Sequence, residues 1–535
     1  MNMVKRTILL VAAFLIGVSP LAAQDDAVDV AVFSLNDFHG AFVQNTAQGI
    51  PGAPSVLQTL DSLKAVYPHH LTVSAGDNFG GSYFYTATQG QLLPVFFDAA
   101  GIRLSALGNH EFDDGQDALA AKWKDAPHRP EGWDLDYICA NVLDSAGRIP
   151  AYAQPYVVSE VAVSPTKTVR IGLVGLLASS AKEQISARRI AGMTFRGDYT
   201  RVLDSLRALP DFKRVEECEI RALLMHIGAR MVDGRPKWDD KNSEELARIA
   251  GPLYQAFLVG HSHDPVCGHI NDDRKPITQG WWHGNFISVM KFRVDTLRMQ
   301  VVGVEPEIVP VPLRSYETLS PRALRLQMQI DSLLQATKTK GGVSIGTRLT
   351  RAVADMPHDR ASKYRISDVG TLVCESYAEA YREAAPGRLP VVGVSHFGSV
   401  RAGFVKGDIT VLDVGEVLPF QNAMNAFRVD GRLFRELVEF GFHNERYGWM
   451  QASNLRAVRD KQGHVTRIYY VAPDGKRTRI KNRTELVIVA DEFMSNGGDG
   501  YDPRFFPKER QLDVQLPAAT DCLIRYLRAR EEIGR

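Results

Sequence analysis

The segment Val30-Ala-Val-Phe-Ser-Leu-Asn-Asp37-Phe-His39-Gly40 joins a run of apolar, β-prone residues to two metal-type side chains. Residues two apart in an extended stretch point the same way, so Asp37 and His39 could address one metal ion above the end of a strand. An Asp-x-His triplet is also common by chance, and alone it favours an ordinary polar loop. Other parts of the chain must decide between these interpretations.

Four further apolar runs end in ligand-type residues. Residues 71–74 precede Gly76-Asp77, residues 104–107 precede Gly108-Asn109-His110, residues 222–225 precede His226, and residues 257–259 precede Gly260-His261-Ser-His263. Short strands alternating with segments that can be helical predict an α/β domain between residues 28 and 309. Ligands bind outside the carboxyl ends of strands in such sheets, so the five strand ends are expected to converge on one crevice.

The ligand-type side chains at these strand ends are too numerous for one tetrahedral ion, but they suit two ions that share a carboxylate. Asp77 is the natural bridge. Imidazole and carboxylate ligands without thiolate suit Zn, Mn, Fe or Co, and the prediction is two divalent metal ions, with Zn or Mn expected first. The predicted metal ligands are Asp37, His39, Asp77, Asn109, His226, His261 and His263.

In this order, the blocks Asp-x-His, Gly-Asp, Gly-Asn-His-Glu, His and Gly-His-x-His resemble those of the calcineurin-like metallophosphoesterases. The version Gly-Asn-His-Glu-Phe-Asp with a second domain is similar to the exported 5′-nucleotidase/UDP-sugar hydrolase family. The resemblance implies a first domain built as a four-layer α/β/β/α sandwich, and a second α/β domain joined to it by a linker helix. It also implies two metal sites, one held by Asp37, His39, Asp77 and His263, the other by Asp77, Asn109, His226 and His261.

His110 and Asp113 of the same motif are the expected catalytic pair. The carboxylate would orient and charge the imidazole, which could then stabilise the phosphoryl transition state or protonate the leaving oxygen. The alternative for Asp113 is an N-cap of a following helix. Two bound ions would activate a water molecule and neutralise charge on the transferring phosphoryl group.

The second half of the chain carries the residues that the resemblance assigns to substrate. It implies that Phe420 and Phe493 sandwich a base, that Asp499 accepts from ribose hydroxyls and that Arg401 binds phosphate, with Asn422 beside them. The alternative for the two phenylalanines is a place in the core. His396-Phe397 and Gln421 replace smaller residues of the family's motifs, so base and sugar preference stay open.

The resulting hypothesis is a two-metal enzyme that removes phosphate from nucleoside 5′-monophosphates, with UDP-sugar hydrolysis as a further activity. A first alternative keeps the metals and changes the substrate, as in a 2′,3′-cyclic nucleotide phosphodiesterase or a thiosulfohydrolase-like relative. A second is a nonenzymatic exported binding protein, which should have lost metal ligands. None of the expected ligands is missing from the sequence.

The remaining features concern organisation and location. Lys5-Arg6, an apolar run at residues 8–18 and Ala22-Ala23 predict a signal peptide over residues 1–23, and hence an exported protein, periplasmic or secreted, without a stable membrane anchor. The expected parts are a catalytic domain at 28–312, a linker helix at 313–342 and a substrate-binding domain at 343–529. With 63 Lys+Arg against 62 Asp+Glu, a nucleotide rather than a nucleic acid is the expected partner. Five scattered cysteines exclude redox chemistry as the function, and the oligomeric state is left open.

Overall fold

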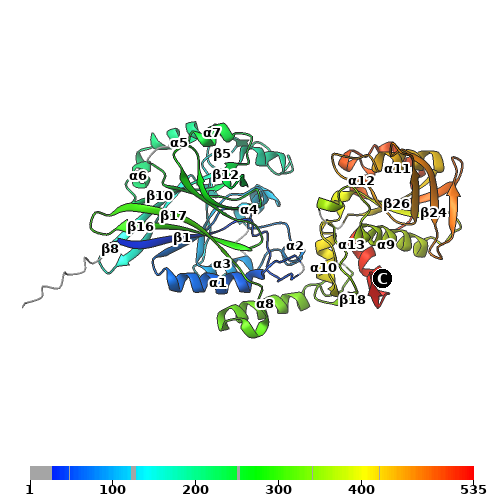
Figure 1. The fold of residues 1–535 in the computed structure, drawn as a ribbon, viewed down its shortest axis with the longest axis horizontal. Coiled ribbons are helices and arrows are strands. Elements are labelled where there is room, and N and C mark those ends of the chain that lie inside the picture. The colour runs from blue at the N-terminus through cyan, green and yellow to red at the C-terminus, as the bar shows by residue number, and fades with distance from the viewer. Residues whose placement is uncertain are drawn as a thin grey trace, which may run out of the picture.

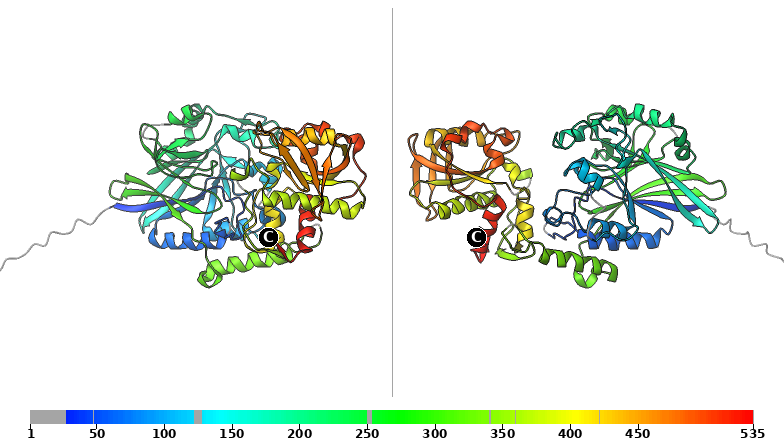
Figure 2. Two further views of the ribbon diagram at one scale, coloured as in Figure 1. Left: turned by 45° about the vertical axis from the view of Figure 1, so that its right-hand side comes forward. Right: turned by 180° about the vertical axis from the view of Figure 1, so that it is seen from behind.

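The structure is a computed structural model that describes residues 27–46, 48–121, 128–249, 253–339, 341–358, 360–420 and 422–534. The expected signal peptide and Gln421 lie outside these residues. Figure 1 shows two parts, one built from the N-terminal half and one from the C-terminal third, joined by helix α8 (Pro321–Ala336). Figure 2 shows the same two parts from two further directions.

The first part contains two large sheets. One has seven strands in the order β17-β16-β1-β2-β3-β4-β6, and the other has six in the order β14-β15-β13-β10-β8-β7. The strands of the first are β1 (Ala27–Leu35), β2 (His70–Ser74), β3 (Ile102–Ala106), β4 (Asp136–Ile138), β6 (Ala153–Gln154), β16 (Phe286–Asp295) and β17 (Gln300–Pro310). Those of the second are β7 (Tyr156–Ser164), β8 (Lys167–Leu177), β10 (Ile220–His226), β13 (Ala256–Leu258), β14 (Pro265–Ile270) and β15 (Lys275–Gly280).

The two sheets share an apolar core. Val30 and Val73 of the first sheet and Leu173 and Leu224 of the second are fully buried in one cluster. Alternate residues of β1 face the other way, so Phe33 belongs to a second cluster under the outer helices. Figure 1 shows α1 (Gly52–Val66) and α3 (Leu93–Ala100) on one side, and α5 (Tyr199–Arg207), α6 (Lys213–Glu216) and α7 (Ser243–Ala247) on the other. The four-layer α/β/β/α arrangement is therefore confirmed.

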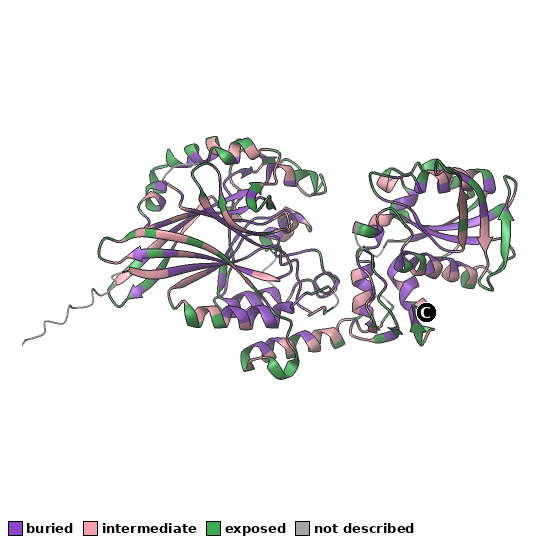
Figure 3. Cartoon of the chain, in the orientation of Figure 1, coloured by how far each residue is buried: buried purple, intermediate pink, exposed green. Residues whose placement is uncertain are grey.

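The second part is built around the four-stranded sheet β21-β26-β19-β22. Its central strand β26 (Glu485–Asp491) is buried from its second residue onward, and Figure 3 shows buried residues inside both parts with exposed ones outside. The other strands of this sheet are β19 (Val391–Ser395), β21 (Met424–Asp430) and β22 (Gln451–Ala452). Two three-stranded sheets flank it, made of β18 (Arg348–Ala352), β20 (Gly407–Thr410) and β27 (Glu532–Ile533), and of β23 (Leu455–Arg459), β24 (Val465–Val471) and β25 (Arg477–Ile480). The helices are α9 (Asp368–Ala384), α10 (Val411–Val417), α11 (Gly431–Gly441), α12 (Glu492–Ser495) and α13 (Ala519–Arg528).

Helix α8 begins at Pro321, inside the segment 313–342 expected as a linker helix, because two local start signals stand there. The Ser320 side chain accepts from the backbone N–H of Ala323, and a proline stands at the first helical position. Leu326 and Ile330 are buried on the face that packs against the first part. None of the helices in the described residues is long and apolar enough to cross a membrane.

The two parts also meet through α2 (Tyr83–Thr88) and α10. The Tyr83 ring lies so close to Gly415 that a Cβ added there would sit 2.0 Å from Tyr83 Cδ1. Beside it, Glu416 Oε1 accepts from the backbone N–H of Tyr83 at 2.7 Å. Burial raises the pKa of Glu416 to about 7. A carboxylate of the second part thus caps a helix of the first.

Candidate metal centre and substrate pocket

The expected metal ligands lie on loops at one edge of both sheets. Strands β1, β2 and β3 are parallel neighbours in the first sheet, and β10 and β13 are parallel neighbours in the second. Their carboxyl ends carry the ligand residues, because His226 ends β10 and the others follow within five residues of a strand end. The structure therefore brings the five strand ends together, as is usual for sites of α/β sheets.

These side chains form two groups that share one carboxylate. Ligand atoms of Asp37, His39, Asp77 and His263 lie within 4.8 Å of one another, and so do those of Asp77, His226 and His261. Asn109 lies at the edge of the second group, where its Oδ1 is 3.0 Å from His261 Nδ1. Asp77 Oδ2 is 3.0 Å from His226 Nε2 and 3.9 Å from His39 Nε2, which places this carboxylate between the groups.

Hydrogen bonds at the rear of two imidazoles leave ring nitrogens free to bind metal. His226 Nδ1 lies 2.8 Å from the carbonyl oxygen of Ala75, and His39 Nδ1 lies 3.1 Å from that of Phe79. A carbonyl only accepts, so both rings carry their proton on Nδ1 and turn the lone pair of Nε2 inward. His226 Nε2 is buried and lies 3.0 Å from Asp77 Oδ2, the carboxylate that the two groups share. His39 Nε2 is 3.0 Å from His263 Nε2, which is close to the spacing of two ligands on one ion. The donor set fits a pair of divalent ions.

The backbone at the ligands is unusual. Asp37, His39, Asp77, His261 and His263 all have φ between 49° and 89°, in the left-handed region that few residues other than glycine adopt. Such conformations cost free energy and persist where the surrounding structure enforces them, which is typical of functional sites. Two of the loops bond each other, since the N–H groups of Asp37 and His39 donate to the carbonyl oxygens of Gly76 and Asp77 at 3.0 Å.

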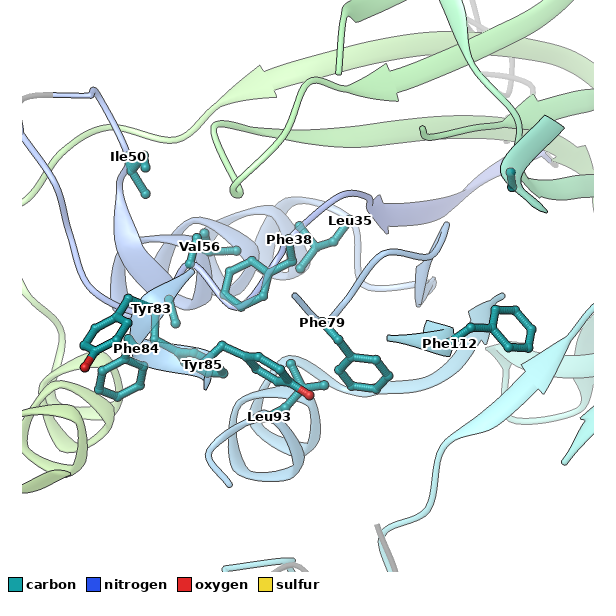
Figure 4. Close-up of a cluster of buried hydrophobic side chains, with 14 of the residues drawn as sticks. Leu35, Phe38, Ile50, Val56, Phe79, Tyr83, Phe84, Tyr85, Leu93 and Phe112 are labelled. Carbon is teal, nitrogen blue, oxygen red and sulfur yellow. The ribbon is translucent and has the colours of Figure 1, made fainter. Parts of the chain in front are cut away.

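A buried aromatic residue anchors each loop of the first sheet. Phe38 stands between Asp37 and His39, Phe79 follows Asp77 by two residues, and Phe112 follows His110 by two. All three rings are fully or almost fully buried, and Figure 4 shows Phe38 and Phe79 among the apolar side chains around α1, α2 and α3. The loops therefore alternate ligands that face the centre with anchors that face the core.

Glu111 ties two of these loops together, a role that the sequence did not predict although the residue stands in the Gly-Asn-His-Glu motif. Its Oε2 accepts from the N–H groups of Asp77 at 3.0 Å and Gly108 at 2.7 Å. Its Oε1 accepts from the backbone and side-chain N–H groups of Asn78 at 2.9 and 3.0 Å. Burial and the charge of Asp77 raise the pKa of Glu111 to about 7, against the four donors, which favour the carboxylate.

The electrostatics of the centre reflect tightly packed opposite charges. Burial alone would raise the pKa of Asp37, but the hydrogen bond and charge of His263 and the charge of His226 outweigh it and lower this pKa to about 2. Burial would likewise lower the pKa of His226, whereas Asp77 raises it to about 10. The centre thus holds ionised carboxylates without arginine or lysine partners among the described contacts, as a cation site requires.

His110 and Asp113 form the expected pair at the rim of the centre. His110 Nδ1 is 2.8 Å from Asp113 Oδ2, and the two side chains are 36% and 38% exposed. Burial would lower the pKa of His110, but the hydrogen bond with Asp113 and the charge of Asp77 raise it to about 9. Asp113 does not begin a helix, because α4 (Gln116–Ala121) starts three residues later, so the N-cap alternative is wrong. A Cβ on Gly80 would lie 2.6 Å from Asp113 Oδ2, so glycine gives the pair its space.

Trp282 is a further residue that sequence patterns did not single out. Its ring stacks on His263, with the centroids 5.1 Å apart and the planes 24° apart. It also stacks on its neighbour His283, which is buried and lies 5.8 Å from the ring of His39. The exposed side of the metal centre is therefore held by an aromatic stack.

In the second part, the residues expected to bind substrate form two groups, and contacts hold the members of each group together. In one, the Arg401 guanidinium lies 5.3 Å from the centre of the Phe420 ring, just beyond α10. In the other, His396 Nδ1 is 2.6 Å from Asp499 Oδ2, and the His396 ring lies 4.9 Å from that of Phe493. For Asn422 the structure shows a backbone contact, since its carbonyl oxygen accepts from Ala519 N–H at 2.9 Å.

The phenylalanines are surface residues. Phe420 is 52% exposed and Phe493 is 47% exposed, so the alternative of two core aromatics is wrong. His396, in contrast, is buried, and its Nε2 has no hydrogen-bond partner. The bulky side chain that the sequence places at this position thus binds Asp499.

Solved structures share this fold. A 5′-nucleotidase precursor from Thermus thermophilus superposes with a TM-score of 0.62 at 21% identity, covering 95% of this chain and 97% of that chain. At this identity the likeness shows the common architecture, which is that of two-domain 5′-nucleotidases.

The sequence comparisons define the second part more closely. Residues 345–505 match the family described as "5'-nucleotidase, C-terminal domain". A 5′-nucleotidase from Vibrio parahaemolyticus is 23% identical over 514 residues, which cover 89% of this chain and 85% of the relative. Endonuclease YhcR from Bacillus subtilis is 23% identical over 533 residues, which cover 94% of this chain and 41% of YhcR, so the chain spans less than half of that relative. The resemblance carried by the sequence motifs is confirmed.

Proposed function

We propose that this chain is a metal-dependent phosphoric ester hydrolase that releases phosphate from nucleoside 5′-monophosphates and also cleaves UDP-sugars. The observation that carries the proposal is the pair of ligand groups sharing Asp77 beside the His110–Asp113 pair. The 5′-nucleotidase C-terminal domain supplies the substrate class.

The ligand assignment follows the two groups. Asp37, His39, Asp77 and His263 hold one ion, and Asp77, Asn109, His226 and His261 hold the other, with Zn or Mn as the expected metal. When bound, the two ions supply Lewis acidity, which activates a water molecule and neutralises phosphoryl charge.

His110 performs the proton chemistry. Asp113 Oδ2 accepts a hydrogen bond from His110 Nδ1–H, so the Nε2 proton of His110 is left for the substrate. As an imidazolium, His110 stabilises the charge of the phosphoryl transition state and can give its Nε2 proton to the leaving oxygen. Glu111 positions the metal ligands, because its carboxylate holds together the loops that carry Asp77 and Asn109.

The second part selects the substrate. Exposed Phe420 and Phe493 offer stacking surfaces for a base, Arg401 offers a guanidinium for phosphate, and Asn422 lies next to them in the chain. The corresponding parts are a catalytic domain at residues 28–312, a linker at 313–342 and a substrate-binding domain at 343–529. Residues 1–23 are proposed to export the chain to the periplasm or beyond, without a stable membrane anchor.

One observation favours a second candidate, a 2′,3′-cyclic nucleotide phosphodiesterase. Asp499, the expected acceptor for ribose hydroxyls, already accepts from His396. A 2′,3′-cyclic nucleotide has no free hydroxyl at either position, so it does not need this acceptor.

The test is hydrolysis of AMP, UMP, UDP-glucose, a 2′,3′-cyclic nucleotide and an aryl phosphate, with and without chelator. Products are separated as well as phosphate measured, because the cyclic nucleotide opens to a nucleoside monophosphate and UDP-glucose gives UMP and glucose 1-phosphate. Chelator-sensitive turnover that prefers 5′-monophosphates is expected. Preference for the cyclic nucleotide would favour the second candidate, and metal-dependent turnover of aryl phosphate alone would refute the nucleoside pocket. Asp77→Asn should abolish turnover while His69→Gln, just before β2 and at its opposite end, should not; activity that survives both chelator and Asp77→Asn would refute the proposal.

A further inference from the structure

A third group of metal-ligand side chains lies in the second part, apart from every residue assigned above. Glu439 stands near the end of α11, His443 two residues beyond that helix, and His464 directly before β24. One ligand atom from each lies within 4.8 Å of the others. Their convergence is tertiary, because His464 reaches the group from the turn between β23 and β24.

From this juxtaposition we propose that Glu439, His443 and His464 bind one divalent transition-metal ion of the zinc class. Two imidazoles and one carboxylate are a common protein ligand set for such an ion, and a fourth position stays open for water or another ligand. Ligands about 2.0–2.1 Å from a tetrahedral ion are roughly 3.3 Å apart, a spacing that these side chains reach by small rotations.

The carboxylate is held in place before any ion arrives. Glu439 Oε2 accepts from the backbone N–H of Val465 at 2.6 Å, while its Oε1 lies 2.8 Å from His464 Nδ1 and 3.7 Å from His443 Nδ1. His443 Nδ1 also lies 2.8 Å from the backbone carbonyl oxygen of Glu439, so His443 offers Nε2 to the ion. The two imidazole rings are 5.6 Å apart. Glu439 and His443 are four residues apart, a spacing that places side chains on one face of a helical turn. Binding through His464 Nδ1 releases to solvent the proton that this nitrogen shares with Glu439.

The site is accessible from solvent. His443 and His464 are 42% and 66% exposed, against 34% for Glu439, and the group borders a surface cavity of about 700 Å³. Phe440 and Phe505 form its apolar wall, and Arg504 on its rim is already paired with Asp502 at 3.1 Å. The open metal position therefore faces a cavity rather than the protein core. A bound ion would pin the β23–β24 turn to α11.

The experiment measures zinc per chain by mass spectrometry after equilibration with zinc and gel filtration. Full-length protein, His464→Gln and Glu439→Gln are compared with two controls. Glu436→Gln changes a carboxylate of the same cavity outside the ligand group, and His269→Gln changes an exposed histidine of the first part. We expect His464→Gln and Glu439→Gln to lose one zinc equivalent and the controls none, with phosphate release unchanged in all four.

A second measurement separates this site from the centre of the first part. In an Asp77→Asn background the remaining zinc should fall by one equivalent when His464→Gln is added. Cobalt should give tetrahedral absorption bands that the same substitution removes. Equal zinc content in full-length protein and His464→Gln, or equal loss in His269→Gln, would overturn the proposal whether or not the chain hydrolyses nucleotides.

Discussion

Glu111→Gln tests how the protein holds its metal loops. The carboxylate accepts four N–H groups from Asp77, Asn78 and Gly108 at 2.7 to 3.0 Å. A glutamine of the same shape has one acceptor oxygen, so in either orientation its NH2 group faces two donors. Each donor left without an acceptor costs about 1–3 kcal/mol, or about 2–6 kcal/mol in total.

The expected result is weaker metal binding rather than unfolding. Loss of a group that positions a metal ligand typically lowers the metal affinity by about 10–100-fold, because the ligands remain but are no longer held in place. The assay is phosphate release against free metal concentration, fixed by a chelator buffer, which gives the metal concentration for half-maximal rate. That concentration should rise about 10–100-fold in Glu111→Gln.

Glu219→Gln is the matched control. Glu219 also accepts from a backbone N–H, that of Arg170 at 2.7 Å, but it precedes β10 at the end opposite His226. The Glu219→Gln substitution should leave the metal concentration for half-maximal rate unchanged. A shift in Glu111→Gln no larger than that in Glu219→Gln would refute this role of Glu111. Glutamine would then reproduce the working state, and Glu111 would act as the protonated acid that its raised pKa allows.

Three further predictions concern the dyad, the aromatic stack and the contact between the parts. His110→Ala should lower kcat about 10²–10⁴-fold with metal content unchanged, and metal loss instead would show that His110 acts structurally. Trp282→Ala should weaken metal binding but leave the His110–Asp113 pair intact. The metal concentration for half-maximal rate should therefore rise at a nearly unchanged maximal rate, and an unchanged concentration would refute the idea that the aromatic stack stabilises the metal centre. Burial raises the pKa of Glu416 from 4.5 to about 7, against the hydrogen bond from the Tyr83 N–H, which favours the carboxylate, so stability should fall as pH rises from about 4.5 through about 7. Melting temperatures of wild type and Glu416→Gln should therefore diverge over that window, and parallel curves would refute the titration of this contact.

Local patterns in the sequence predict the strands and the convergence of their ends. The expected strands at residues 30–35, 71–74 and 222–225 lie within β1, β2 and β10, and the start of α8 is set by Ser320 and Pro321. These features depend on neighbours in the chain, where apolar runs and capping residues carry the information.

Such local patterns do not predict contacts between residues that are distant in the sequence. Nothing near Glu111 in the sequence shows that its carboxylate will meet the N–H groups of Asp77 and Asn78. The bond between His396 and Asp499, and the meeting of His464 with Glu439, likewise join segments that only the tertiary fold brings together. Sequence motifs therefore identify ligands better than the groups that position them.

Both ligand groups draw on both sheets of the sandwich. Asp77 comes from the seven-stranded sheet, whereas His226 and His263 come from the six-stranded one. The apolar layer between the sheets, with Val73 and Leu224 in one cluster, is close-packed and transmits strain. It therefore acts as a spacer that sets the distance between the members of each ligand group that come from different sheets. Selection for a different metal radius can act on methyl groups of this layer, far from any residue that touches substrate.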